Sequence, residues 1–249
     1  MMIFVIPVYN EEKNIKSLLR NVFTYVESKK WSCKIILADD GSTDSTVSIA
    51  NGMKGTFPLE VVSNPVNMGP GAAFDSGFRQ ALKNTGEDDI IITMEADNTS
   101  DIGILDKMIA EMDAGTEIVL ASCYAKEGTV EGATLCRKIL SYGANIIVRM
   151  LSRDKKINTF SSFYRCYRSG ILSKAYTVYG SKFIEENGFL CAVDILLKLQ
   201  RLGVQVKEVP MILRSSKRVG KSKMKTIKTI LSYLKLFVKE GIRSVVNTK

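Results

Sequence analysis

Residues 2–46 read MIFVIPVYNEEKNIKSLLRNVFTYVESKKWSCKIILADDGSTDST, and they predict a strand, a helix and a second strand. The apolar run Met2–Ile6 has the length of a buried strand and ends at Pro7. Residues 11–25 then carry apolar side chains at helical spacing, and residues 34–38 form the next apolar run. Strands that are apolar along their whole length and alternate with helices are typical of a parallel sheet covered on both faces.

The same alternation continues to residue 121 and then changes. The apolar patterns predict strands at 59–62, 90–94 and 118–121, and helices from 43 or 44 to 53, at 71–83 and at 101–112. Beyond Thr129 they predict helices at 132–151, 192–202 and 226–246, strands at 160–167 and 204–209, and a basic loop at 214–225. We therefore expect an α/β domain over residues 1–225, with halves 1–121 and 122–225, followed by an amphipathic basic helix at 226–249.

Composition narrows the possible chemistry. The 249 residues are 45% apolar and 24% charged, which is typical of one globular domain with a proper core. The chain contains no histidine, so it has neither a Ser-His-Asp triad nor a His-ligated zinc, and acid–base or metal chemistry depends on carboxylates. The net charge of +9 indicates an anionic partner, which charge alone does not identify as nucleic acid, nucleotide or phospholipid.

The cysteines and the apolar runs indicate in which cellular compartment the protein is expected. Five cysteines lie scattered without a CxxC pair, which favours reduced thiols in a cytoplasmic protein. The N-terminal apolar run is short and has no basic residues before it, so we expect no signal peptide. No apolar run approaches the ~18–20 residues that cross a bilayer. We expect a cytoplasmic protein, either soluble or peripheral on a membrane surface.

Acidic and turn residues follow three of the predicted strands. They are the segments Asn10-Glu11-Glu12, Asp39-Asp40 and Glu95-Ala96-Asp97. In open parallel sheets ligands bind beyond the carboxyl ends of the strands, so the three segments are expected to meet in one crevice. This crevice is the predicted functional site.

Two of these segments suggest specific ligands. Glu95 and Asp97 are alternate residues just past a strand, so both carboxylates can reach one cation, and such hard oxygen ligands suit Mg²⁺ or Mn²⁺. Asp39 or Asp40 can accept hydrogen bonds from a base or ribose. The alternative interpretation is structural in both cases: an acidic turn that precedes a helix, and a turn with a helix N-cap.

Glycine-rich and basic segments elsewhere carry weaker signals. Residues 67–73 lack the third glycine of a dinucleotide fingerprint, and Ser215 stands where a Walker motif ending at 220–222 needs glycine. The basic loop 217–223 suits anionic oxygens or is simply a solvated loop. The last helix either packs on the domain or lies on an anionic membrane. No nucleic-acid-binding module is present.

Taken together, these segments resemble family 2 glycosyltransferases of the GT-A fold, and most closely the branch that acts on dolichyl or polyprenyl phosphate. The resemblance covers nearly the whole chain. Its motifs are IPVYNEEKNI at 6–15, ADDGSTDST at 38–46, NMGPGAAFDSGFRQAL at 67–82, MEADNTSD at 94–101, RKILSYGA at 137–144, GFLCAVDILLKL at 188–199, KEVP at 207–210 and GKSK at 220–223.

The resemblance implies a role for each matching position. Pro7, Tyr9, Glu11 and Asp39 would bind the nucleoside, and residues 95–97 would hold the diphosphate through a divalent ion. Asp97 is then the principal metal ligand, assisted by Glu95 and Thr99. The positions expected at the acceptor phosphate, or in a loop closing over the phosphates, are Arg137, Ser141, Lys217, Arg218 and Lys223.

Two positions depart from the pattern of the branch. Glu95 replaces the first aspartate of the DxD motif and is one methylene longer. Ser122-Cys123-Tyr124 stands where the branch has Ser-Arg-Tyr, so a phosphate-binding arginine is missing. Either another cation, such as Arg165 or Lys126, compensates for it, or the substrates differ.

The reaction that the resemblance implies is inverting transfer of a hexose from a donor of the GDP-mannose or UDP-glucose type to a lipid phosphate at a membrane. An ionised phosphate needs no strong base. A hydroxyl acceptor is the alternative, and Asp194 would then be the catalytic base unless it is an ordinary helix residue. A binding protein that has lost catalysis is the alternative of another class. Assembly with an integral-membrane partner or into a homo-oligomer is compatible with both transferases, the one with a lipid-phosphate acceptor and the one with a hydroxyl acceptor.

Overall fold

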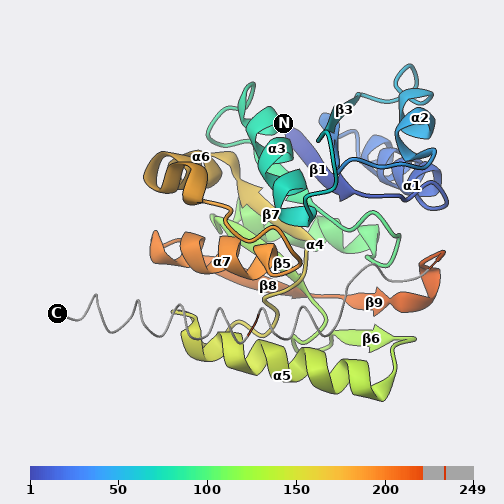
Figure 1. Cartoon of the computed structure of the whole chain (residues 1–249). Coiled ribbons are helices and arrows are strands. Elements are labelled where there is room, and N and C mark those ends of the chain that lie inside the picture. Colours follow the sequence, from blue (N-terminus) through green and yellow to red (C-terminus); the bar gives the residue numbers. More distant parts are fainter. Residues whose placement is uncertain (221–232, 234–249) are drawn as a thin grey trace.

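A seven-stranded, mostly parallel sheet forms the centre of the computed structural model (Figure 1). The structure describes residues 1–220, without the side chains of 135–140, and Tyr233. Among the described strands of this sheet, β7 alone runs antiparallel to its neighbours. The strands in spatial order are β3 (Leu59–Ser63), β2 (Cys33–Asp39), β1 (Met2–Val8), β4 (Ile90–Thr93), β7 (Arg165–Arg168), β5 (Ile118–Ser122) and β8 (Val206–Pro210).

Helices cover both faces of this sheet. One face carries α1 (Ile15–Ser28), α2 (Thr46–Asn51) and α4 (Leu105–Asp113), the last preceded by the 3₁₀ turn η1 (Ile102–Ile104). The other face carries α3 (Pro70–Leu82), α6 (Ser169–Tyr179) and α7 (Cys191–Arg201), with η2 (Gly180–Lys182) between the last two. At the lower edge in Figure 1 lie α5 (Leu135–Leu151) and the two-stranded ribbon of β6 (Thr129–Glu131) and β9 (Ile212–Arg214), which is followed by η3 (Ser215–Lys217).

The alternation of side chains along each strand produces two hydrophobic cores. In β1, Ile3 and Val5 join the core under α3 and α7, whereas Phe4, Ile6 and Val8 join the core under α1 and α4. β2, β4 and β5 divide their side chains in the same way. Both faces of these strands are buried, which explains why the strands are apolar throughout instead of alternating with polar residues.

The predicted sheet and its coverage on both faces are confirmed, while several element boundaries are corrected. The strand expected at 160–167 is only Arg165–Arg168, and the sequence pattern did not predict the helix Ser169–Tyr179 that follows it. Residues 160–164 instead form irregular backbone, and hydrogen bonds from Thr93 and Arg165 to its carbonyl oxygens hold it. The helix expected at 226–246 lies outside the described residues, except for Tyr233, which is buried in the core shared by α5 and α7. The division into halves at residue 121 stays a prediction.

The described cysteine side chains, Cys33, Cys123, Cys166 and Cys191, are free thiols, as expected. Burial raises the pKa of Cys123 to about 12, so this thiol stays protonated at neutral pH. Within the described residues no helix is both long and apolar enough to cross a membrane.

Gly77 allows α3 to pack directly on the sheet. A Cβ atom at this position would lie 2.5 Å from Val5 Cγ1 and 3.1 Å from Ala38 Cβ. We expect Gly77→Ala to lower the free energy of unfolding by about 1–3 kcal/mol because it overpacks this contact. Urea denaturation measures the change.

Gly143→Ala is the matched control, since Gly143 also lies in a helix but a Cβ atom added there would have no described neighbour within 4 Å. It should stabilise the protein by up to about 1 kcal/mol through helix propensity. Equal effects of the two substitutions would show that the contact between α3 and β1 is looser than the structure indicates.

Candidate functional site

The loops after β1 and β2 meet at one edge of the sheet. Asn10 N donates to Ser42 Oγ at 2.9 Å, and Glu11 N donates to Thr46 Oγ1 at 2.7 Å. The sheet order places β4 beside β1, and the connection after β1 runs to β2 on one side whereas the connection after β4 runs toward β5 on the other, so the two diverge. Such a point in a parallel sheet leaves a crevice beyond the strand ends. The structure thus brings the segments after β1, β2 and β4 to one edge.

The two aspartates at the end of β2 have different surroundings. Asp39 Oδ1 accepts a hydrogen bond of 3.0 Å from Ser42 N. Both oxygens of Asp40 are used by the chain itself: Oδ1 accepts from Met68 N at 3.0 Å, and Oδ2 accepts from Gly69 N at 2.6 Å. Asp40 therefore anchors the loop that leads into α3. The expected roles of Asp39 and Asp40 at the nucleotide stay predictions.

The loop after β4 carries the candidate metal ligand Asp97. Its Oδ1 accepts hydrogen bonds from Thr99 N at 3.1 Å and from Thr99 Oγ1 at 2.6 Å. Its Oδ2 accepts from Arg218 Nε at 2.6 Å and also from Arg218 Nη2. Asp97 is 8% exposed, and its carboxylate already faces a cation.

Glu95 and Ala96 do not face the site as Asp97 does. Glu95 Oε1 accepts from Phe163 N at 3.1 Å, and Oε2 accepts from Ser100 Oγ at 2.5 Å. Burial, and to a smaller extent the charge of Asp97, raises the pKa of Glu95. Glu95 therefore joins the loop after β4 to the segment before β7. Its expected role as a metal ligand stays a prediction. The small side chain of Ala96 is buried in the core.

The remaining donor set still fits a divalent ion of the Mg²⁺ type. Among the described residues, no group of three or more carboxylates and thiols is placed to hold an ion. Asp97 nevertheless offers a carboxylate, and Thr99 Oγ1 lies beside it. Mg²⁺ is commonly held by one or two carboxylates together with substrate phosphates and water, so one strong protein ligand is consistent with such a site.

Asn14 carries no functional signal in the sequence, yet it links three parts of the site. It stands at the N-cap position of α1, but its side chain makes no capping bond. Its Nδ2 instead donates to Glu11 Oε2 at 2.7 Å and to Val219 O at 3.0 Å, and its Oδ1 accepts from Val219 N at 3.1 Å. The position before Ile15 suggests a cap, and no local pattern could indicate a partner 205 residues away.

Asn98 is a second residue that the sequence does not reveal. Its φ of +61° lies in the left-handed region, which asparagine adopts more readily than most residues. Its Nδ2 donates to Asn14 O at 3.2 Å and to Ser17 Oγ at 3.0 Å. These bonds attach the turn between Asp97 and Thr99 to α1.

Residues 217–220, which we call the strap, follow β9 and reach the loops after β1 and β4. Arg218 contacts Asp97 and Val219 contacts Asn14, while Lys217 is exposed. Arg218 is thus placed against the candidate metal ligand Asp97, and its expected role at the phosphates stays a prediction. Lys223 lies outside the described residues.

Of the positions expected at the acceptor phosphate, Arg137 and Ser141 lie on α5, whereas Arg165 lies in β7. Ser141 is half-buried on α5, and the side chain of Arg137 on the same helix is among those the structure does not describe. Arg165 is 1% exposed, and its guanidinium donates to Phe160 O, Ser162 O and Ala192 O. These carbonyl bonds hold Arg165 in the core, and its expected role at a phosphate stays a prediction. Lys126 is exposed.

Asp194 is also committed to the chain's own structure. Its Oδ2 lies 2.9 Å from Lys198 Nζ and accepts from Glu185 N at 3.3 Å. Lys198 Nζ, also buried, donates to Lys182 O at 2.6 Å and to Glu185 Oε2 at 3.0 Å. The pair holds the loop before α7. The role of Asp194 as a catalytic base for a hydroxyl acceptor stays a prediction.

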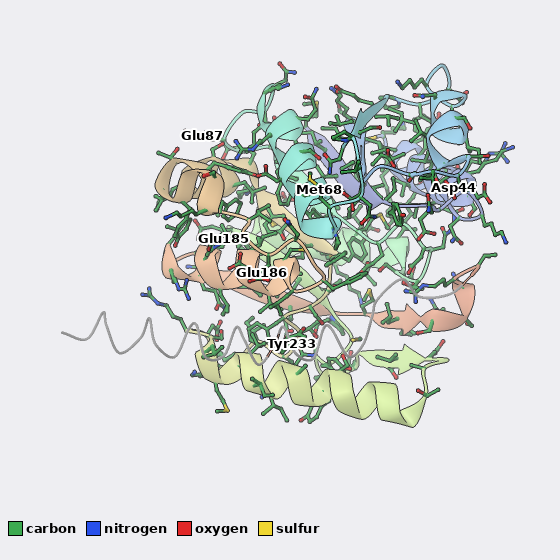
Figure 2. All side chains as sticks on the ribbon, viewed as in Figure 1. Asp44, Met68, Glu87, Glu185, Glu186 and Tyr233 are labelled. Atoms are coloured by element: carbon green, nitrogen blue, oxygen red, sulfur yellow. The ribbon has the colours of Figure 1, made fainter. Side chains whose placement is uncertain are left out.

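That loop in turn supports the start of α3. Gly71 N donates to Asn187 O at 2.9 Å, and a Cβ atom added at Gly71 would overlap the carbonyl oxygen of Glu186. Figure 2 shows Glu185 and Glu186 in this loop, beside α7, and Met68 beside α3. Lys198 thereby positions an element that borders the site without touching a ligand.

We expect Asp194→Asn to lower the free energy of unfolding by about 1–3 kcal/mol, because Lys198 would lose its buried counter-charge. Glu185→Gln is the matched control: its carboxylate also pairs with Lys198, but the side chain is 28% exposed, so the loss should be under about 1 kcal/mol. Chemical denaturation compares the variants. Unchanged stability together with lost transfer to a hydroxyl would support Asp194 as a base.

Comparison with known sequences bears on what this site does. The family model described as Glycosyl transferase family 2 matches residues 3–175. The dolichol-phosphate mannosyltransferase of Pyrococcus furiosus is 28% identical over 93% of this chain, which spans only 61% of that protein. The polyprenol monophosphomannose synthase of Mycolicibacterium smegmatis is 28% identical over 88% of this chain and 79% of that protein.

Solved structures share the fold at low sequence identity. Glucosyl-3-phosphoglycerate synthase from Mycobacterium tuberculosis, in complex with Mn²⁺ and UDP-glucose, has a TM-score of 0.64 and 17% identity, covering 95% of this chain and 78% of that one. The S. aureus TarS fragment 1–349, in complex with UDP-GlcNAc, has a TM-score of 0.61 and 18% identity, covering 96% of this chain and 66% of that one. Both confirm the expected architecture.

Proposed function

The chain belongs to the family 2 glycosyltransferases and has their GT-A fold, and on that premise we propose that it transfers a hexose from a nucleotide-diphospho-sugar to a polyprenyl phosphate. The observation that carries the proposal is the ion pair of Asp97 with Arg218 beyond the carboxyl end of β4, at the edge of the sheet where β2 ends with Asp39. The names of the two relatives support a lipid-phosphate acceptor.

The proposed reaction is one inverting displacement. An oxygen of the acceptor phosphate attacks the anomeric carbon, the new C–O bond forms, and the bond to the nucleoside diphosphate breaks with its electron pair leaving on the diphosphate. Because the acceptor oxygen is already ionised near neutral pH, no residue has to remove a proton. This fits a chain without histidine in which the described Asp194 is buried in an ion pair.

Each donor-site residue has a role in this proposal. Asp39 would bind the base, with Pro7, Tyr9 and Glu11 lining the nucleoside pocket, and Asp97 with Thr99 would hold Mg²⁺ or Mn²⁺. The divalent ion would neutralise charge that develops on the leaving diphosphate. The side chain of Arg218 lies at the same place and adds a positive charge there.

We expect Mn²⁺-dependent binding of GDP or UDP that is at least about tenfold weaker in Asp97→Ala, equivalent to about 1.4 kcal/mol. Calorimetric titration of GDP, UDP and dTDP with and without Mn²⁺ measures it. Asp106→Ala is the control, because Asp106 is an exposed carboxylate on α4 that pairs with Lys29. A folded wild type that binds no nucleotide would contradict the proposed donor site.

Transfer itself separates the enzyme from a binding protein without catalysis. Incubation with GDP-mannose or UDP-glucose, Mn²⁺ and a polyprenyl phosphate should yield the glycosyl-phospho-lipid, detected by mass spectrometry. Nucleotide binding without this product, and with product on a hydroxyl acceptor, would favour the hydroxyl-directed alternative. Nucleotide binding without any product would favour the binding protein.

The exposed face of α5 supports peripheral contact with the membrane that carries such an acceptor. Tyr142, Ile146 and Met150 follow one another at intervals of four residues and are 51%, 42% and 61% exposed. Residues at this spacing share one helix face. The same helix carries Ser141 and Arg137, the positions expected at the acceptor phosphate. An apolar helix face of this kind can enter the headgroup region of a bilayer.

We expect the triple substitution of Tyr142, Ile146 and Met150 to serine to reduce, several-fold, the fraction of protein that floats with anionic phospholipid vesicles, because apolar contact area is lost. Val178→Ser is the matched control, since Val178 is 57% exposed but lies on another helix, α6. Unchanged flotation of the triple variant would place the membrane contact elsewhere.

A further inference from the structure

The carboxylate of Asp97 has both of its oxygens engaged. Thr99 supplies two donors to Oδ1, and the guanidinium of Arg218 supplies two donors to Oδ2, one of them at 2.6 Å. The two side chains of the ion pair, Asp97 and Arg218, are 11% and 21% exposed, so solvent screens their attraction only in part. Any cation that binds Asp97 through Oδ2 has to share this oxygen with Arg218 or replace it.

Sharing is unfavourable because a guanidinium and a divalent ion repel each other at contact distance. Arginine also has no neutral form at ordinary pH, so proton loss cannot relieve the repulsion. The Thr99 bonds leave Oδ2 as the oxygen that faces the strap. Replacement is therefore the outcome that the arrangement favours.

The strap has a second attachment that does not involve Asp97. The side-chain amide of Asn14 pairs with both the N–H and the C=O of Val219, at 3.1 and 3.0 Å. Asn14 is 2% exposed and also donates to Glu11. The next residue after Arg218 thus stays fixed beside the donor site when the guanidinium leaves Asp97.

We propose that Arg218 is the resident counter-ion of the metal site: it occupies Asp97 Oδ2 in the metal-free chain, exchanges with the divalent ion, and then binds the diphosphate of the donor. The inference rests on the proposed function and deepens it, because it assigns Arg218 to the donor diphosphate and not to the acceptor phosphate. Metal binding to Asp97 competes with the ion pair between Arg218 and Asp97. By linkage, each of these two interactions lowers the equilibrium constant of the other by the same factor.

Manganese binding to the full chain without nucleotide tests the exchange. Titration followed by the electron paramagnetic resonance signal of free Mn²⁺ should show that Arg218→Gln binds Mn²⁺ at least about fivefold more tightly than Lys217→Gln. Lys217→Gln is the matched control, since it removes the same charge from the neighbouring residue of the strap, whereas the described ion pair of Asp97 is with Arg218. Equal affinities of the two variants would overturn the proposal.

The sign of the effect should reverse when the diphosphate is present. With saturating Mn²⁺, Arg218→Gln should bind GDP or UDP several-fold more weakly than Lys217→Gln, because this variant lacks the guanidinium that binds the diphosphate after the exchange. A variant with improved metal binding and unchanged nucleotide binding would overturn the second half of the proposal.

Limited trypsin digestion tests the wild type without relying on the folding of a variant. Saturating Mn²⁺ should accelerate cleavage after Arg218, measured by mass spectrometry, since the side chain leaves Asp97. In Asp97→Asn the cleavage should be fast already and should not respond to Mn²⁺. Cleavage that Mn²⁺ slows or leaves unchanged in the wild type would contradict the exchange.

The outcomes distinguish this inference from the proposed function. If neither the wild type nor Arg218→Gln binds Mn²⁺, even with GDP or UDP, the metal site fails and the exchange fails with it. If Mn²⁺ and nucleotide bind, but Arg218→Gln and Lys217→Gln behave alike, only the exchange is refuted.

Discussion

The burial of β1 on both of its faces organises the sheet and, through it, the site. Ile3 and Val5 enter one core and Phe4, Ile6 and Val8 enter the other, while β2 and β4 pair with the two edges of the strand. A strand buried on both faces lies inside a covered sheet, and the connections that leave β1 and its neighbour β4 run in opposite directions, toward β2 and β5. The crevice at its carboxyl end follows from that topology, and so does the meeting of three loops there.

Most of the carboxylates near this edge serve the chain itself. Asp40 anchors the loop before α3, Glu95 ties the loop after β4 to the segment before β7, and Asp194 neutralises the buried Lys198. Buried carboxylates need such partners because an unpaired charge is costly away from water. What distinguishes Asp97 is that its partner, Arg218, belongs to a surface strap and can be exchanged.

Contacts between residues far apart in the chain join the strap and the loop before α7 to the candidate site. Asn14 bonds to Val219, and Asp97 bonds to Arg218, so the strap is tied directly to the loops after β1 and β4. On the other side, the loop before α7 packs against the first turn of α3 through Gly71. Both contacts therefore connect the candidate site to segments that lie far along the chain.

The α/β class, the strands up to residue 121, the edge at which the acidic segments collect, and the family could all be predicted from the order of residues. Local periodicity and turn chemistry carry that information, because each depends on neighbours within a few residues. Which carboxylates are already occupied became apparent only in the folded chain, since Asp40 and Glu95 carry the same signal in the sequence as Asp39 and Asp97. Each of Asp40, Glu95 and Asp97 has a distant partner, 28, 68 and 121 residues away respectively, and no local pattern encodes contacts over such separations.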